Sequence, residues 1–172
     1  MPQNLGNSYG DKLNVYRNYF EAIATKYKPI GHTPGSSRFE TYSRAAVMAG
    51  RRKREEGFNL TQFCLILLDA TPSFNAASER RNQLELEGAF EIVKFNERND
   101  LDQYAIQAQA FNMCEEIAAH MIQEHSTKNT GGGFSLGNLI EDSIDFYIVD
   151  EVFDKAVGYG CSFRYSVGFD KT

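Results

Sequence analysis

The sequence predicts an α+β fold in which an antiparallel sheet of about four strands packs against a long helix and N-terminal helices. Three observations predict this class. An apolar stripe with helical spacing runs through residues 101–125, and a strict alternation of apolar and small residues runs from Val157 to Phe169. Short connections between paired strands are typical of hairpins, whose strands are antiparallel. We expect residues 1–172 to form a single domain.

Two helices are predicted before the first strand. Over residues 11–27, apolar and aromatic residues return every three or four positions, which is the spacing of one helix face, and Pro29 follows. A second helix is predicted over residues 39–56, with Phe39 and Tyr42 on its inward side.

Two strands are predicted in the middle of the chain. The first has the apolar run Phe63–Leu68 at its centre, and the second spans residues 84–95, where apolar residues alternate with Glu. The sequence Thr71-Pro72-Ser73 is expected to break the first strand. Residues 71–81 are then expected to form a projecting loop or arm.

The longest predicted helix and two strands complete the fold. The helix stripe over residues 101–125 consists of Ala108, Phe111, Cys114, Ile117, Ala118, Met121, Ile122 and His125. The last two strands are centred on Ile144–Ile148 and Val157–Phe169. A strand of about 12 residues reaches roughly 40 Å. A single compact core does not need strands of that length, so we expect part of their surface to contact another molecule.

Composition excludes several classes of protein. The net charge of −5 argues against a general nucleic-acid binder, which needs a basic surface. The three cysteines are far apart and form no C-x-x-C pair, so we expect no disulfide framework or zinc site and a reducing compartment. All three follow the apolar pattern of their predicted elements, so we expect them to be buried. Residues 1–10 lack the apolar segment of a signal peptide, and the run Phe63–Leu68 is too short to cross a bilayer.

No catalytic, cofactor-binding or metal-binding pattern emerges. His120 and His125 are five residues apart on a predicted helix, which separates them by about 140° around its axis. Neither a phosphate-binding loop nor a dinucleotide-binding glycine pattern is present. We therefore expect no metal, no organic cofactor and no enzymatic activity. An enzyme whose site is assembled from dispersed residues remains an alternative, with His32 and surface tyrosines as candidate catalytic residues.

Two charged clusters have several interpretations. The basic run Arg51–Arg54 is a solvated helix end, a patch for an acidic protein neighbour, or a phosphate contact. Six acidic residues gather within residues 141–154, where the spacing of a calcium-binding EF-hand is absent. A solvated, mutually repelling surface is the simpler interpretation of the acidic cluster.

The last predicted strand supplies most of the candidate interface. Its face opposite the aromatic residues is built from small side chains, so a neighbour can approach closely. Glycines within a strand, here Gly158 and Gly160, either let another backbone come close or mark a bulge. The candidate interface residues are Arg51, Arg52, Lys53, Arg54, Phe74, Gly158, Gly160, Ser162, Arg164 and Ser166.

The C-terminal third carries a resemblance to a known family. Val152-Phe153-Asp154, followed by Gly158 and the alternating residues 160–167, resembles the C-terminal strand of tailed-phage neck and tail-completion proteins. Earlier pieces agree in order: Arg38-Phe39 with Tyr42, Leu67-Leu68-Asp69, Phe90-Glu91-Ile92-Val93, and then the long helix.

The resemblance implies a structural protein of the virion, assembled in the bacterial host cytoplasm. Proteins of this family pack helices on an antiparallel sheet and form rings in the head–tail connector, neck or tail, where tail terminators belong. The implied partners are identical subunits and neighbouring portal, neck or tail proteins, with no membrane. DNA would only pass through the ring lumen. The alternative is a small protein-binding module or a host-directed phage protein.

Overall fold

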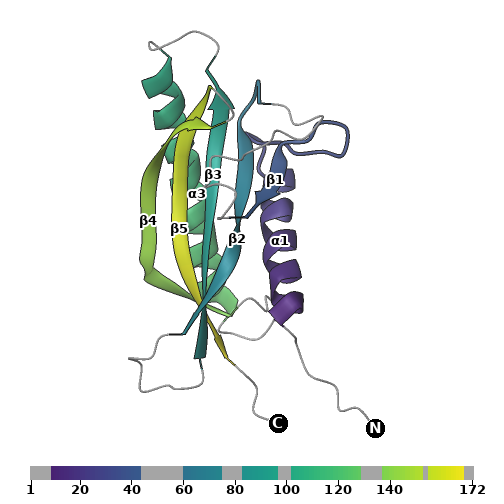
Figure 1. Ribbon diagram of the computed structural model, residues 1–172, viewed down its shortest axis with the longest axis vertical. Coiled ribbons are helices and arrows are strands. Elements are labelled where there is room, and N and C mark those ends of the chain that lie inside the picture. The colour runs from purple at the N-terminus through teal and green to yellow at the C-terminus, as the bar shows by residue number, and fades with distance from the viewer. Residues whose placement is uncertain are drawn as a thin grey trace.

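A computed structural model describes residues 9–43, 60–74, 83–96, 102–128, 137–152 and 155–168 (Figure 1). The elements in chain order are α1 (Tyr9–Lys26), β1 (Phe39–Tyr42), β2 (Cys64–Phe74), β3 (Gln83–Phe95), α3 (Gln103–Lys128), β4 (Asn138–Val152) and β5 (Ala156–Gly168). The architecture is α+β, with the long helix α3 packed on a sheet.

The five strands form one mixed sheet in the order β1-β2-β3-β5-β4. Three neighbouring pairs are antiparallel, as predicted, but β1 runs parallel to β2. The prediction of a helix from residue 39 is therefore wrong over Phe39–Tyr42, and residues 44–56 lie outside the described residues. Phe39 and Tyr42 are three residues apart, which suits a helix face, whereas pairing with Leu65–Leu68 is a distant contact that local spacing cannot reveal.

Strand β2 also continues where a break was predicted. It runs through Pro72 to Phe74, so the predicted arm at residues 71–81 begins as strand, and residues 75–82 lie outside the described residues. Pairing with β1 covers only Leu65–Leu68. Beyond Leu68 strand β2 has no partner on that side among the described residues, and proline is tolerated at such an edge.

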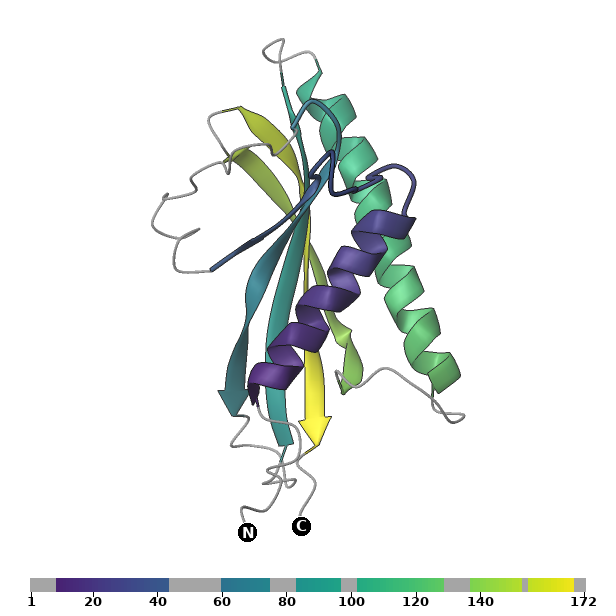
Figure 2. The same cartoon turned by 90° about the vertical axis from the view of Figure 1, so that its right-hand side faces the viewer.

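Both helices cover the same face of the sheet (Figure 2). Helix α1 contacts β1 and β2, while α3 contacts β3, β5 and β4. The main core lies between the helices and the sheet, with Phe20, Phe90 and Phe163 at its centre and all at most 1% exposed. The alternations predicted for β3 and β5 are confirmed where side chains are described, because these apolar residues are buried in this core: Leu86, Phe90, Ile92, Val157, Cys161, Phe163 and Tyr165. The side chains of Leu84 and Val167, and residue Phe169, lie outside the described residues.

Helix α3 confirms most of the predicted stripe. Cys114, Ile117, Ala118 and Met121 are buried, and Ile122 is partly buried. Two members differ: Ala108 is exposed, and Phe111 is only partly buried. Phe111 lies towards the β4 side, where it contacts Phe146 and Tyr159 at ring-centroid distances of 5.4 and 5.0 Å. The side chain of His125 lies outside the described residues.

The opposite face of the sheet has a smaller apolar cluster. Its buried members come from the segment before β2 and from four strands: Leu60, Cys64, Ile66, Leu68, Ala89, Val93, Val149 and Ala156. Towards the other end of β3, the same face presents Glu85 and Glu87, which are partly exposed. No helix of the described part covers this face (Figure 2).

Candidate functional site

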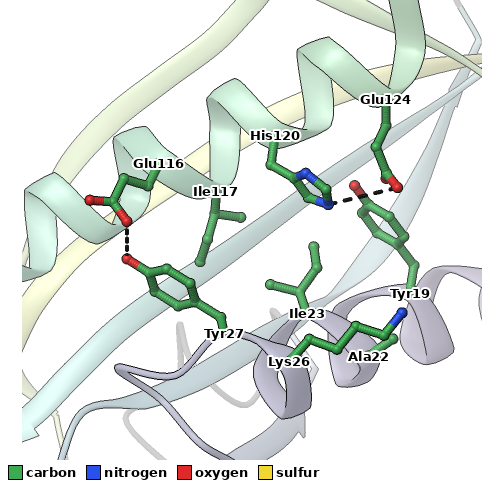
Figure 3. Close-up of a pocket in the computed structure, with 9 residues that line it drawn as sticks. All are labelled: Tyr19, Ala22, Ile23, Lys26, Tyr27, Glu116, Ile117, His120 and Glu124. Carbon is green, nitrogen blue, oxygen red and sulfur yellow. Dashed lines mark hydrogen bonds and ion pairs between the residues drawn. The ribbon is translucent and has the colours of Figure 1, made fainter. Parts of the chain in front are cut away.

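A cleft lies between α1 and α3, on the outer side of the helix layer (Figure 3). Its volume is about 560 Å³, which is within the usual range for ligand pockets. Apolar side chains, chiefly Ile23 and Ile117, form its floor, and polar side chains from both helices form its rim. The lining residues are Tyr19, Ala22, Ile23, Lys26, Tyr27, Glu116, Ile117, His120 and Glu124.

The polar rim is held by contacts between its own members. Tyr27 donates its hydroxyl hydrogen to the Glu116 carboxylate over 2.5 Å, which joins α1 to α3. His120 Nε2 lies 3.7 Å from Glu124 Oε1, one turn further along α3. The Tyr19 hydroxyl lies beside Glu124 at the same end of the cleft (Figure 3). These contacts pair the rim side chains across and along the two helices (Figure 3).

The protonation states of the cleft follow from burial. Desolvation, with a smaller effect of Glu124, raises the pKa of Tyr19 well above its ordinary value. Desolvation and the hydrogen bond to Glu116 raise the pKa of Tyr27 in the same direction. Both phenols are therefore neutral donors at physiological pH and are not activated as bases or nucleophiles. The described cleft can receive an apolar group between polar rims, and binding is the chemistry that its geometry offers.

The two histidines whose side chains the structure describes lie in separate surroundings. His32 accepts a hydrogen bond at Nδ1 from the backbone N–H of Arg38 over 3.1 Å, and its ring lies against Phe39. His120 lines the cleft and is exposed. Within the ranges that the structure describes, no three His, Cys, Asp or Glu side chains are grouped closely enough to hold a metal ion.

All three cysteines are free and buried, as the apolar pattern predicted. Desolvation raises the pKa of Cys114 and brings the pKa of Cys161 to about 12, so both remain protonated thiols. Cys114 donates from Sγ to the carbonyl oxygen of Tyr159, which joins α3 to β5. These thiols pack as small apolar groups and lack the electropositive surroundings of a reactive cysteine.

The predicted small-residue face of β5 is already occupied by the chain itself at Gly160. In the register of the sheet, Tyr147 of β4, Gly160 of β5 and Glu91 of β3 lie in one row. A Cβ atom at Gly160 would come within 2.3 Å of the Tyr147 ring. Tyr147 crosses β5 at this point and donates its hydroxyl to Glu91 over 3.3 Å. The expected open surface is therefore wrong at this position, since it is an intramolecular contact.

At Gly158 the backbones of β5 and β3 come unusually close together. A Cβ atom there would lie 1.8 Å from the carbonyl oxygen of Ile92. The prediction that a glycine in this strand lets another backbone come close is confirmed at this residue. Gly158 is buried and is not a surface residue.

The remaining interface candidates are dispersed. Ser162, Arg164 and Ser166 lie on the helix-free face and are partly exposed, with Arg164 Nη1 3.1 Å from Glu85 Oε2. Phe74 ends β2, and its side chain lies outside the described residues. The basic run of residues 51–54 also lies outside them.

The α1–α3 cleft is the feature that sequence reasoning missed. Glu116, His120 and Glu124 recur every four residues, which places them on one side of a helix. That spacing is readable in the sequence. Their position opposite Tyr19 and Tyr27 depends on how two distant helices pack, which no local pattern gives.

No protein-family model, no curated protein and no solved structure matches this chain. Among the described helices, none has the length and apolar character needed to span a membrane.

Proposed function

We propose that this protein is a structural subunit of a homomeric ring in the head–tail connector, neck or tail of a tailed bacteriophage, similar in role to a tail terminator. The resemblance of residues 152–167 to the C-terminal strand of such proteins motivates the proposal. In this role the protein performs no catalysis and binds no cofactor. Its partners are identical subunits and the adjoining portal, neck or tail proteins.

The observation that carries the proposal is the length and position of β4. This strand has 15 residues and forms one edge of the sheet, and its neighbour β5 has 13. Strands of globular proteins usually have about five or six residues. Within the described residues no strand pairs with the outer side of β4, so parts of this edge offer backbone donors and acceptors to a neighbouring chain. Register shifts between Ile140 and Asp145 and between Val149 and Val152 divide the edge into shorter stretches.

The helix-free face adds a second reason. Glu85 and Glu87 are partly exposed on it, and Arg164 of the same face pairs with Glu85, which leaves one carboxylate in excess among these three groups. Acidic side chains facing the lumen of a ring would repel the phosphates of passing DNA and keep it from adhering. We therefore assign this face to the lumen in the proposed assembly.

Purified particles of the phage that encodes this chain test the proposal. Mass spectrometry should detect the protein at a fixed number of copies per particle. A reconstruction should then show a rotationally symmetric ring at the head–tail junction or along the tail, into which the five-stranded sheet and two helices fit. Each subunit should bury more than the roughly 1,600 Å² of an ordinary pairwise interface, because it has at least two neighbours.

A non-structural enzyme of the same phage, measured in the same particles, sets the background for this experiment. Absence of the protein from particles, or its presence as an isolated pair without rotational symmetry, would contradict the ring. The α1–α3 cleft then favours the second candidate, a small protein-binding module, because its apolar floor and polar rim suit a partner side chain.

A further inference from the structure

The two outer edges of the sheet differ in charge. In the strand order β1-β2-β3-β5-β4, the edges are β1 and β4, and Figure 1 shows β4 on one side of the molecule and α1 with β1 on the other. Strand β4 contains five acidic residues and no Lys, Arg or His. Residues 9–43, which form α1 and β1, contain five Lys or Arg and three Asp or Glu.

The β4 edge also exposes apolar surface. Ile148 of β4 is 55% exposed, and Tyr104 of α3 is 82% exposed. Both are close to one contact, in which the side-chain amides of Gln103 and Gln107 donate to Asp150 of β4. Residues Glu141, Asp142, Asp145 and Asp150 are exposed along the same strand. We call Tyr104, Ile148 and these four acidic residues the acidic edge.

The opposite side presents exposed cations. Arg17 is nine residues before Lys26 in α1, and at about 100° per residue the two lie on opposite sides of the helix. Since Lys26 lines the cleft facing α3, Arg17 points away from α3. Lys28 is exposed just after the helix ends. Arg17 and Lys28 define the basic edge.

We propose that the acidic edge of one copy of this chain docks against the basic edge of the next copy. The inference rests on the proposed ring and names its lateral contact. Opposite charge selects the occupant, because an acidic edge repels another acidic edge and attracts a basic one. The exposed Ile148 and Tyr104 supply apolar area that a neighbour would bury.

This contact is head-to-tail, since the two edges are different surfaces of the same chain. A head-to-tail contact repeats from copy to copy and closes into a ring when the rotation between copies allows it. Pairing of two identical β4 edges would instead stop at a dimer and would place their carboxylates face to face.

Two charge-reversed full-length proteins test the contact. The first carries Asp142→Lys and Asp145→Lys, and the second carries Arg17→Glu and Lys28→Glu. All four side chains are exposed, so the variants should fold, which circular dichroism and thermal melting verify. Self-association is measured by sedimentation velocity over a range of protein concentrations at low and physiological salt.

We expect wild-type protein to associate, and more weakly as salt rises. Each double variant alone should associate at least about tenfold more weakly, because the first leaves the acidic edge without net charge and the second makes the basic edge acidic. An equimolar mixture of the two variants should regain assembly, since the introduced lysines of one variant meet the introduced glutamates of the other. Asn112→Lys with Ala119→Lys is the control, because both residues are exposed on the outer side of α3, between the side that faces β4 and the side that lines the cleft. This variant should associate like wild type.

The inference is wrong if wild-type protein stays monomeric at every concentration. It is also wrong if either double variant, measured alone, associates like wild type, or if the mixture of the two stays monomeric. Dimers formed only when wild type is mixed with the first variant would show β4-to-β4 pairing instead. The particle reconstruction is independent of these outcomes. A ring in particles with a failed charge swap rejects this contact alone, and a successful swap with no ring in particles rejects the proposed role alone.

Discussion

Two aromatic clusters hold the helices to the sheet, and they differ in how completely they are enclosed. The inner cluster joins α1 to the centre of the sheet through Phe20, Phe90 and Phe163, with ring centroids 5.5 to 6.1 Å apart. The outer cluster joins α3 to the β4 side through Phe111, Phe146 and Tyr159. The inner rings are fully buried, whereas all three outer rings keep some exposure.

The difference follows from the strand order. Phe90 and Phe163 lie on β3 and β5, which have strands on both sides, so neighbouring side chains surround them. Phe146 lies on the edge strand β4, which is flanked on one side only within the described part of the chain. The protein therefore has an enclosed centre and a less enclosed β4 side, and the acidic edge of the proposed contact lies on the less enclosed side.

Gly88 leaves room for two aromatic side chains of the inner cluster to pack against the sheet. It lies on β3 opposite a bulge in β2, where the register shifts between Leu68 and Thr71. A Cβ atom at Gly88 would come within 2.6 Å of the Phe163 ring and 2.7 Å of the Tyr16 hydroxyl. The absence of a side chain at this point gives both aromatic residues room against the sheet.

The largest effect is expected for Phe163→Ala in the inner cluster. Removal of a fully buried aromatic ring loses its transfer free energy and leaves a cavity among Tyr16, Phe20 and Phe90. The free energy of unfolding should fall by about 3–5 kcal/mol. Urea unfolding followed by circular dichroism measures this change, and a loss below about 1 kcal/mol would remove Phe163 from the centre of the core.

A smaller effect is expected for Phe111→Ala in the outer cluster. The sequence pattern alone placed Phe111 in the core, where the cost would match that of Phe163. Because the ring is only partly buried, less apolar area returns to water and solvent can fill the space. We expect a loss of about 1–2.5 kcal/mol, roughly half of the fully buried value. Equal losses for the two variants, measured in the same urea series, would contradict the comparison.

The sequence predicted the inner region better than the outer one. Helix α1 and strands β3 and β5 have regular apolar spacing, because the same face of each is buried along most of its length. The pattern failed where burial depends on distant partners. Strand β1 was predicted as helix, because its four residues pair with the distant β2. Pro72 was expected to end β2, but it is tolerated because pairing with β1 ends at Leu68. Gly160 was expected on an interface, but the Tyr147 side chain covers it.

The features of the candidate site also fall into those that local spacing predicts and those that depend on distant partners. Local spacing identified the buried cysteines and the close backbone approach at Gly158, since both follow from a single strand or helix. It identified neither the cleft nor the charge difference between the edges. Those features arise only once the strand order places α1 and β4 on opposite sides and brings α1 beside α3.

The smallest of the stability changes is expected for Tyr16→Phe, which leaves the inner rings in place and removes one hydroxyl. That hydroxyl lies 3.0 Å from the carbonyl oxygen of Leu68 and 3.3 Å from that of Ala89, beside the bulge of β2. A bulge interrupts the ladder, so a carbonyl there needs another donor. Loss of a buried hydrogen bond should lower the free energy of unfolding by about 1–2 kcal/mol.

Tyr104→Phe is the matched control for this change, because Tyr104 is 82% exposed and its hydroxyl is solvated. It should alter the free energy of unfolding by less than about 0.5 kcal/mol. Hydrogen exchange of the β2 and β3 amides adds a local measurement, in which Tyr16→Phe should speed exchange around Leu68 and Ala89 more than at the distant β4 strand. If both variants unfold like wild type, the bulge does not depend on Tyr16. The inner cluster would then be stabilised by ring packing alone.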